Sequence, residues 1–410
     1  MGRSSTPSRD ECCSHGVLQS QERICSRRGA GCPRVNDRFR EIRDARFGLD
    51  DRSAVVAPYG LDASVQDGVT RAYCRHCPRS GFEYFPVLDP FGAPAMTDSR
   101  LHVVFGAGQV GGALVAHLAG AGSVVRVVSR HQPPTLPEGV ESRLVDVTDG
   151  DAAADAAKGA SVVYQCLNAP YSDWPKRFPP LQAAVVAAAE RADALLVTLE
   201  NVYGYGPTGG TPMTELSPLA ATTVKGRARV AMTRELFAAS EAGRLRIAIG
   251  RASDFFGAGV TESTLGERVF ANAVAGKRAD FIGNPDLPHT YSYVPDIAAG
   301  LAVLGTDERA VGQVWHLPGP ETLTTRAVLE LIAGQVGHPV SIRSVPKLML
   351  QTLGLVNPTM RGLAEMAYQF EQPFVLDTTE YESTFGAAGT AMDVAIKETV
   401  AWYQGQGSSK

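Results

Sequence analysis

The sequence predicts an α/β protein, with a doubly wound parallel sheet followed by a smaller C-terminal lobe. Short β-branched runs alternate with helical stretches between residues 101 and 250, which is typical of a parallel sheet with helices on both faces. A glycine-rich turn directly follows the first of these runs. After Arg251 the alternation breaks up, and this change indicates the second lobe.

Residues 1–95 differ in composition from the rest of the chain. They contain fourteen Arg, no Lys and six of the seven Cys, with few periodic apolar stretches, so we expect a disordered extension. Met96 resembles a natural translation start. On this hypothesis, residues 1–95 are translated only because an upstream start codon was chosen. Cys74 and Cys77, with His76 between them, supply at most half of a zinc site. Because a closed site needs four ligands, we expect no metal.

The charge and hydropathy of the chain exclude several classes of partner. A net charge of −4 and a pI near 6.1 do not suit a nucleic-acid binder, which normally carries a basic field. No apolar run approaches the roughly 18 residues that span a bilayer, and the N-terminus lacks the apolar core of a signal peptide. We therefore expect a cytoplasmic protein that acts on a small molecule, without nucleic-acid or membrane partners.

The first strand leads into a phosphate-binding turn. Gly106, Gly108 and Gly111 form a GxGxxG pattern after LHVVF and at the head of an amphipathic helix that begins with Gln109 and Val110. Such glycines allow a tight turn, a close approach of the pyrophosphate and close packing of the helix on the sheet. The helix N-terminus adds free N–H groups and a positive dipole. This context predicts a Rossmann-type dinucleotide site.

The predicted sheet sets the domain boundaries. We expect the dinucleotide-binding domain over residues 96–251, with a return near 291–317, and the substrate-binding lobe over 252–290 and 318–405. Six strands are expected from the apolar runs, at residues 101–105, 123–129, 142–147, 161–167, 194–199 and 245–250.

The end of the second strand favours NADP(H) over NAD(H). An NAD site usually places an acid there to bind the ribose hydroxyls, whereas this chain has Ser129 and Arg130. A guanidinium can bind a 2′-phosphate in bidentate fashion, although a solvated loop arginine is the alternative. By the strand count, Asp146 and Val147 border the adenine and Asn168 lines the nicotinamide side.

Five further motifs in sequence order resemble the extended short-chain dehydrogenase/reductase family, which includes the nucleotide-sugar epimerases and dehydratases. The likeness runs from about Leu101 to Tyr403 and implies a Rossmann fold, a nicotinamide cofactor and a homodimer. The motifs after the glycine turn are NVYGYG (201–206), PMTELSP (212–218), GRASDFFGAGV (250–260), YSYVPDIAAGLAVL (291–304) and the strand and helix over 313–333.

The chain departs from this family at the catalytic positions. The family uses a Tyr-x-x-x-Lys helix, and no such pattern follows the VYG element here. Alignment on the downstream apolar pattern puts Lys225 at the Tyr position and Arg229 at the Lys position, while alignment on Lys225 itself puts Ala221 at the Tyr position. The family's Ser or Thr position falls on Leu199, and Thr198 lies one residue away on the opposite face of the strand.

These departures leave several catalytic assignments open. Lys225 can bind the ribose hydroxyls or act as a general acid, with its pKa lowered by burial and by Arg229, but a solvated lysine is the alternative. Tyr203 and Tyr205 are alternative phenols. Arg251 and the aromatic residues Phe255, Phe256, Tyr291 and Tyr293 either enclose a substrate or pack in the core.

Two functions fit the sequence. The first is an NADP(H)-dependent oxidoreductase, or an epimerase or dehydratase, that acts on a carbonyl or sugar-type substrate through a non-standard catalytic site. The second is a non-catalytic NADP(H) sensor, because the tyrosine and the correctly placed Ser or Thr are missing. Neither the substrate nor the direction of reaction follows from the residues.

Overall fold

The computed structural model describes residues 55–56, 61–66, 69–74, 99–345 and 347–407, and the chain divides into two compact units. In the first unit, β1 (Val55–Val56), β2 (Leu61–Gln66) and β3 (Val69–Cys74) form an antiparallel sheet in that order. The sequence analysis did not expect this sheet. Most of residues 1–95 lie outside the described residues, as do the side chains of Cys74, His76 and Cys77, so the predictions of disorder and of no zinc site stay predictions.

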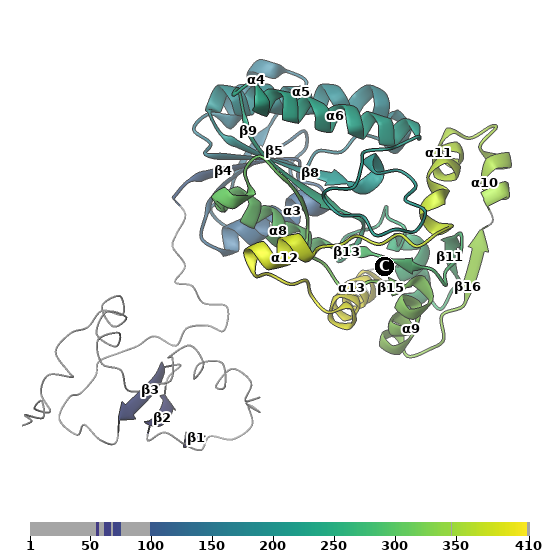
Figure 1. Ribbon diagram of the computed structural model, residues 1–410. Coiled ribbons are helices and arrows are strands. Elements are labelled where there is room, and N and C mark those ends of the chain that lie inside the picture. Colours follow the sequence, from purple (N-terminus) through teal and green to yellow (C-terminus); the bar gives the residue numbers. More distant parts are fainter. Residues whose placement is uncertain (1–54, 57–60, 67–68, 75–98, 346, 408–410) are drawn as a thin grey trace, which may run out of the picture. The chain divides into compact units, whose positions relative to one another are not determined.

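A seven-stranded parallel sheet organises the second unit (Figure 1). The strand order places β4 and β7 side by side at the centre, and the chain runs outward from them in opposite directions. Every strand pair in this sheet is parallel, and the doubly wound fold is confirmed. In spatial order the strands are β14 (Val314–His316), β9 (Arg246–Ala252), β8 (Leu195–Asn201), β7 (Val162–Gln165), β4 (Leu101–Phe105), β5 (Val124–Ser129) and β6 (Glu141–Leu144).

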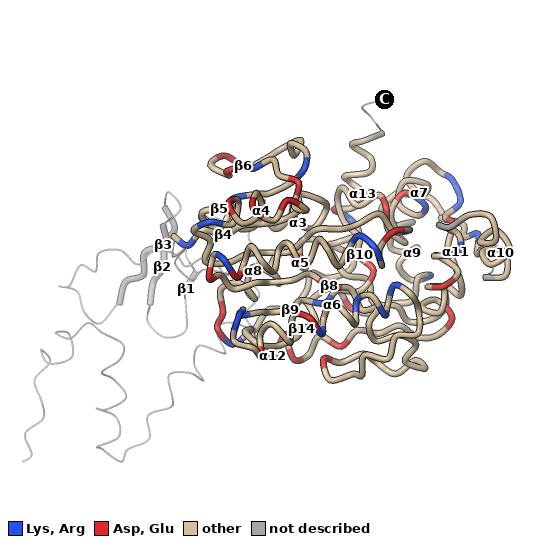
Figure 2. The backbone as a smooth tube through the Cα atoms, turned by 90° about the horizontal axis from the view of Figure 1, so that it is seen from above, with Lys and Arg blue, Asp and Glu red and all other residues tan. Residues whose placement is uncertain are grey.

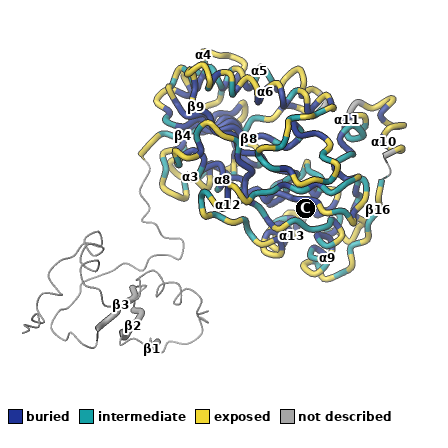
Figure 3. The backbone as a smooth tube through the Cα atoms, in the orientation of Figure 1, coloured by how far each residue is buried: buried dark blue, intermediate teal, exposed yellow. Residues whose placement is uncertain are grey.

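Helices cover both faces of this sheet, and the strands between them are buried (Figures 1 and 3). On one face, α3 (Gln109–Gly120) packs against α8 (Val294–Thr306) over the apolar side chains of β4 and β7. On the other face lie α4 (Gly150–Ala157), α5 (Trp174–Ala192) and α6 (Val224–Glu241). The central strands β4 and β7 are mostly apolar because both of their faces are covered, whereas the edge strand β6, with the sequence ESRL, is half-buried or exposed.

The C-terminal lobe has its own core of aromatic and aliphatic side chains. Phe256, Tyr291 and Tyr293 are among its buried members, so the core-packing alternative holds for these three residues. The elements that build the lobe are β10 (Asp254–Phe256), the π-helix η5 (Gly266–Ala271), α7 (Asn272–Val274), β11 (Ala279–Ile282), β12 (Pro288–His289), β13 (Tyr291–Tyr293), β15 (Leu323–Thr324), α9 (Thr325–Val336), β16 (Ile342–Val345), α10 (Lys347–Leu353), α11 (Pro358–Met366), the 3₁₀ turn η7 (Ala367–Phe370) and α13 (Met392–Gly407). Helix α12 (Thr379–Phe385) instead packs against β14 of the large sheet.

Local capping fixes the start of the helix that carries the expected catalytic positions. The hydroxyl of Thr223 accepts a hydrogen bond from the backbone N–H of Gly226 at 3.1 Å, which satisfies one of the free donors in the first turn of α6. A β-carbon on Gly226 would lie 2.6 Å from the backbone oxygen of Tyr203. The absence of a side chain at Gly226 therefore allows the first turn of α6 to pack closely against the turn that follows β8.

Within the described part of the chain, every helix is either too short or too polar to cross a membrane.

Candidate active site

The site is set by the point at which the strand order reverses. Parallel sheets of this kind bind ligands outside the carboxyl ends of the strands that flank the reversal, here β4 and β7. The loop after β4 is the glycine turn, and the loop after β7 leads into the 3₁₀ turn η3 (Tyr171–Asp173). The turn after β8, η4 (Val202–Gly204), and the first turn of α6 follow at the same edge.

The three glycines of the turn have three different structural requirements. Gly106 has φ of +104°, which disfavours a side chain, and a β-carbon there would lie 2.7 Å from the backbone oxygen of Cys166. A β-carbon on Gly111 would lie 1.9 Å from the backbone oxygen of Gly106. Gly108 has φ of −74°, and its β-carbon would meet no atom within 4 Å. Packing therefore explains Gly106 and Gly111, whereas Gly108 faces open space.

This open space fits a dinucleotide. The first turn of α3, which begins with Gln109 and the buried Val110, contains no acidic residue, and Gly108 at its N-cap supplies no side-chain hydrogen bond. The helix therefore begins with free N–H groups and a positive dipole beside the open space at Gly108, which suits a pyrophosphate. The Gln109 side chain reaches the backbone oxygen of Gly259 at 3.5 Å and so connects this turn with the C-terminal lobe.

The residues expected at the adenosine end lie after β5 and β6. Ser129 is buried and donates its hydroxyl proton to the backbone oxygen of His131 at 2.7 Å, whereas Arg130 is exposed. Asp146 is exposed and accepts hydrogen bonds from the N–H and the hydroxyl of Thr148, and these bonds, together with the charge of Arg130, lower the pKa of its carboxyl. Arg130 and Asp146 therefore lie close enough to interact.

Val147 and Asn168 complete the predicted cofactor residues. Val147 is buried at 2% exposure and packs with Val103 and Val128 beneath the sheet edge. Asn168 is exposed, three residues beyond the end of β7. Cys166, which the sequence analysis did not select, lies under the glycine turn, and burial raises the pKa of its thiol to about 12.

Lys225 lies in the first turn of α6 and is 5% exposed. Its Nζ is 4.2 Å from the centre of the Tyr171 ring and 3.8 Å from a carboxylate oxygen of Glu365 in α11. Burial lowers the pKa of the Lys225 ammonium, and the Glu365 charge raises it part of the way back. Burial is thus the main cause of the shift. The expected contribution of Arg229 is not among its causes.

Arg229 shares the buried face of α6 but points into the layer of α5. Its guanidinium carbon lies 4.0 Å from the centre of the Phe178 ring and 5.0 Å from that of Trp174. Its Nε and Nη1 atoms are buried and have no hydrogen-bond partner among the described residues. Burial lowers the pKa of the Arg229 guanidinium to about 10, despite the opposing charge of Glu200.

Tyr171 contacts Lys225, but the two predicted tyrosines, Tyr203 and Tyr205, differ in position. Tyr203 shares a hydrogen bond with Tyr171, and burial raises the pKa of both phenols. Tyr205 instead lies in a buried network away from Lys225. Its hydroxyl accepts a hydrogen bond from Arg251 at 2.8 Å and lies 2.6 Å from Nε2 of His316.

Arg251 belongs to the same buried network and is therefore not free to bind a substrate. Its Nε donates to Glu200 at 3.1 Å, and both side chains are almost fully buried. Thr198 lies on the same face of β8 as Glu200 and is 1% exposed, with its hydroxyl unpartnered among the described residues. Leu199 faces the other side, toward α3 and α8. The hydroxyl of Thr198 is therefore separated by the sheet from the face on which Leu199 lies.

Three site residues from the C-terminal lobe escaped the sequence analysis. Glu365 pairs with Lys225, as described above. Asp254 starts β10 and lies 3.1 Å from Nε2 of His289. The hydroxyl of Tyr368 is buried without a hydrogen-bond partner among the described residues, and burial, with the charges of Asp254 and Glu365, raises its pKa. Only Asp254 carried a sequence signal, because it lies within the GRASDFFG motif.

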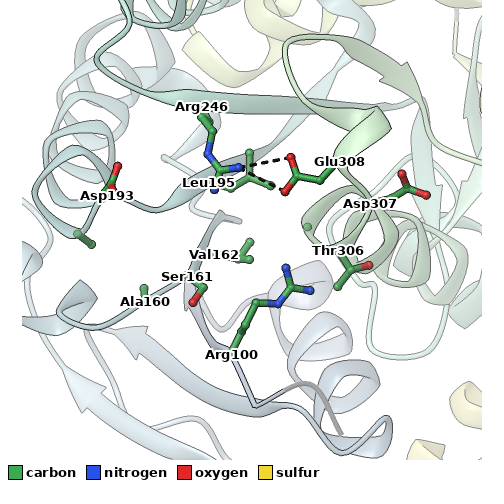
Figure 4. Close-up of a pocket in the computed structure, with 12 residues that line it drawn as sticks. Arg100, Ala160, Ser161, Val162, Asp193, Leu195, Arg246, Thr306, Asp307 and Glu308 are labelled. Atoms are coloured by element: carbon green, nitrogen blue, oxygen red, sulfur yellow. Dashed lines mark hydrogen bonds and ion pairs between the residues drawn. The ribbon is translucent and has the colours of Figure 1, made fainter. Parts of the chain in front are cut away.

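Two cavities lie elsewhere in the unit. One, of about 400 Å³, is at the amino-terminal ends of β7, β8 and β9, where Ser161, Asp193, Arg246 and Glu308 line it (Figure 4). The other, of about 380 Å³, is lined by residues such as Thr290 and includes the loop over 388–391. Neither is lined by the glycine turn or by Lys225.

Comparisons with known proteins identify the family. The sequence model of the NAD dependent epimerase/dehydratase family matches residues 102–317, just over half of the chain. Over 279 residues the chain is 28% identical to dTDP-6-deoxy-L-talose 4-dehydrogenase (NAD(P)(+)) of Kitasatospora kifunensis, covering 62% of this chain and 84% of that protein. It is also 28% identical over 255 residues to 2'-dehydrokanamycin reductase of Streptomyces kanamyceticus, covering 60% and 69% of the two chains.

Solved structures show the same fold. dTDP-glucose 4,6-dehydratase of Bacillus anthracis, solved in complex with NAD, aligns with a TM-score of 0.64 at 16% identity over 76% of this chain and 98% of its own. UDP-glucose 4-epimerase of Thermus thermophilus, also solved in complex with NAD, aligns with a TM-score of 0.60 at 18% identity over 74% and 99%. The resemblance identified from the motifs is confirmed, and the chain belongs to the NAD dependent epimerase/dehydratase family.

Proposed function

We propose that the protein is an NADP(H)-dependent oxidoreductase that acts on a sugar-type carbonyl or alcohol, with Lys225 as the proton-transfer group. One observation carries this proposal. A buried ammonium with a lowered pKa occupies the first turn of α6, at the same edge of the sheet as a glycine turn that is open toward a dinucleotide. Proton transfer at neutral pH favours a group whose pKa has moved toward that range.

The proposed chemistry is a carbonyl reduction and its reverse. NADPH, when bound, supplies a hydride to the carbonyl carbon. Lys225 donates a proton from Nζ to the carbonyl oxygen and is left as a neutral amine, which regains a proton from solvent. The Glu365 carboxylate, 3.8 Å away, holds the ammonium in place and favours reprotonation of the neutral amine.

Arg229 is proposed to support the cofactor rather than the proton transfer. Its aromatic contacts with Phe178 and Trp174 fix the guanidinium plane. The two unpartnered nitrogen atoms are donors, and buried donors of this kind normally have a partner. The ribose hydroxyls of a bound nicotinamide nucleotide can supply the acceptors for these two donors.

NADP(H) is the preferred form in this proposal because of Arg130. Its guanidinium is exposed at the end of β5 and can bind a 2′-phosphate in bidentate fashion. Asp146 lies near Arg130. Without the cofactor, the Asp146 carboxylate attracts the Arg130 guanidinium, and a bound 2′-phosphate has to compete with it.

The curated relatives support sugar redox chemistry. By their names, one is a dehydrogenase at position 4 of a deoxytalose nucleotide and the other a reductase of a dehydro-aminoglycoside. Both names describe the interconversion of a carbonyl and an alcohol. The alternative, a non-catalytic NADP(H) sensor, is favoured by the burial of the Thr198 hydroxyl.

Turnover separates the two functions. Purified protein is incubated with NADPH and a panel of sugar-derived ketones and aldehydes, and oxidation is followed at 340 nm, as is reduction of NADP⁺ with the matching alcohols. We expect turnover with at least one carbonyl, and a loss of about 10² to 10⁴ in kcat for Lys225→Met with the fold intact. NADPH binding without turnover of any compound would support the sensor, and equal rates in Lys225→Met would remove Lys225 from the mechanism.

A further inference from the structure

Helix α11 closes over the ammonium of Lys225. A β-carbon on Gly362 would lie 2.7 Å from Nζ of Lys225 and 3.4 Å from Cε1 of Tyr171, so the backbone of α11 rests directly on both side chains. The Tyr171 ring also covers the ammonium, with its centre 4.2 Å from Nζ. Lys225 is left only 5% exposed. In this arrangement Nζ has almost no surface that a substrate can reach.

Polar contacts of Glu365 hold α11 in this position. One carboxylate oxygen accepts a hydrogen bond from the backbone N–H of Val224, which begins α6. The other lies 3.8 Å from Nζ of Lys225, and the Glu365 side chain is 24% exposed. Ion pairs that water reaches contribute little to stability. Glu365 is therefore a latch between α11 and α6 that water can replace.

The hairpin of α10 and α11, residues 347–366, has little apolar packing to hold it on the lobe. Among the residues that the structure describes, the apolar clusters that form the core of this unit take no member from 347–366. Helix α10 packs chiefly on α11, and α11 packs on the turns η3 and η7. Segments with few buried apolar contacts open at a lower free energy than the core.

The outer side of the hairpin is exposed and apolar. In Figures 1 and 2 the two helices stand at the edge of the unit, with α10 outermost. Leu355 and Val356, between the helices, are 82% and 86% exposed. Leu348, Met349 and Leu353 of α10 are also exposed. These side chains do not pack on the lobe, so they do not oppose movement of the hairpin away from it.

The chemistry of Lys225 requires such a movement. A proton donor has to come within about 3 Å of the oxygen that receives the proton, but the Gly362 backbone, the Tyr171 ring and the Glu365 carboxylate occupy the surroundings of Nζ. We propose that the hairpin of α10 and α11 is a lid, which is closed over Lys225 in this structure and moves away to admit the substrate. This inference rests on the proposed function, and it adds how the substrate reaches the same site.

Lysine acetylation of the full-length protein tests the closed state. The protein is treated briefly with acetic anhydride, and each lysine is quantified by peptide mass spectrometry. Lys397, exposed on α13, is the internal reference. We expect Lys225 to react roughly tenfold or more slowly than Lys397, because only molecules with the lid open can react.

A variant on α11 tests the opening. In Gly362→Ala the new methyl group would lie 2.7 Å from Nζ of Lys225 and should push the lid away. Acetylation of Lys225 and tryptic cleavage after Arg361, which is exposed on α11, should both become roughly fivefold or more faster. The melting temperature should stay unchanged, because the hairpin lies outside the apolar core.

A matched glycine and a second variant complete the test. Gly334→Ala is the control, since this glycine lies on α9 in the same lobe and its β-carbon would meet no atom within 4 Å. It should change neither rate. If Gly362→Ala does not fold, Glu365→Gln replaces it. Cleavage after Arg361 is then the readout, because it does not depend on the pKa of the Lys225 amine, and it should again become faster.

Two results would overturn the inference. One is acetylation of Lys225 as fast as that of Lys397 in the unmutated protein, which would mean that α11 does not cover the ammonium. The other is acetylation and cleavage that stay slow in the folded variants and rise only when urea unfolds the whole protein, because α11 would then be a fixed wall. Neither measurement needs cofactor or substrate. NADPH binding and turnover therefore judge the proposed function separately.

Discussion

Replacement of Gly108 separates cofactor binding from folding. Its φ of −74° is open to any L-residue, and a β-carbon there meets no atom within 4 Å, so Gly108→Ala and Gly108→Val should fold. Surface changes of this kind alter stability by about 0.5 kcal/mol or less. The new side chain nevertheless projects into the space assigned to the pyrophosphate.

The loss of affinity follows from the hydrogen bonds that the new side chain prevents. A hydrogen bond to a charged group contributes about 1.5 to 3 kcal/mol, and about 1.4 kcal/mol corresponds to a factor of ten in Kd. Displacement of the pyrophosphate from one backbone N–H should therefore weaken NADPH binding by roughly 10- to 100-fold in Gly108→Ala. In Gly108→Val the branched side chain fills more of the space, and binding should be undetectable.

The assay combines NADPH fluorescence titration with thermal denaturation of each variant. Gly120→Ala is the matched control, since its β-carbon also meets no atom within 4 Å but lies at the far end of α3, and it should bind NADPH normally. Gly111→Ala is the opposite case, because its β-carbon would lie 1.9 Å from a backbone oxygen, and it should lose folded protein. Unchanged NADPH affinity in folded Gly108→Val would refute the proposed path of the pyrophosphate.

Four further outcomes are expected. Arg130→Ala should remove most of a tenfold or greater preference for NADPH over NADH, and equal affinities in the unmutated protein would reject the 2′-phosphate assignment. Burial lowers the pKa of Lys225, so reductive kcat, which needs the ammonium, should fall as pH rises through that pKa, and Lys225→Arg should shift or abolish this fall. Deletion of residues 1–95 should leave NADPH affinity unchanged, because the sheet begins at β4; insoluble protein would contradict this. Burial lowers the pKa of His316 from 6.5 to about 4, so the unfolded chain binds the proton more readily and urea stability should drop by about 3 kcal/mol between pH 6.5 and 4, with a smaller drop in His316→Gln.

The dinucleotide side of the site could be predicted because its requirements are local. A strand, three glycines and a helix lie within twenty residues. Gly111 is required by the backbone of Gly106 in the same turn, whereas the close contact of Gly106 is with the backbone of Cys166 after β7. Lys225 was selected as a candidate for a related reason, since the downstream apolar pattern of α6 fixes its register. The same helical spacing placed Arg229 on the face of Lys225, where the structure has it.

The surroundings of Lys225 could not be predicted in this way. Glu365 reaches it from α11, whose packing depends on the whole lobe, and no pattern near residue 365 marks it. Tyr171 could have been predicted more easily from the sequence, because it follows the fourth predicted strand by only a few residues. The pKa of Lys225 was expected to respond to Arg229, but the guanidinium turns toward Phe178 and Trp174, and burial dominates.

The return of the chain to the sheet has a consequence for synthesis on the ribosome. Helix α3, which carries the dinucleotide turn, is covered by α8, and β14 closes the edge of the sheet beyond β9. Both elements follow some forty residues that belong to the C-terminal lobe. A nascent chain that has emerged only as far as β9 therefore exposes the apolar face of α3 and an unpaired edge of β9, the kind of surface that chaperones protect. The dinucleotide-binding half cannot finish folding before residue 316 leaves the exit tunnel, and the two lobes are not separable units of translation.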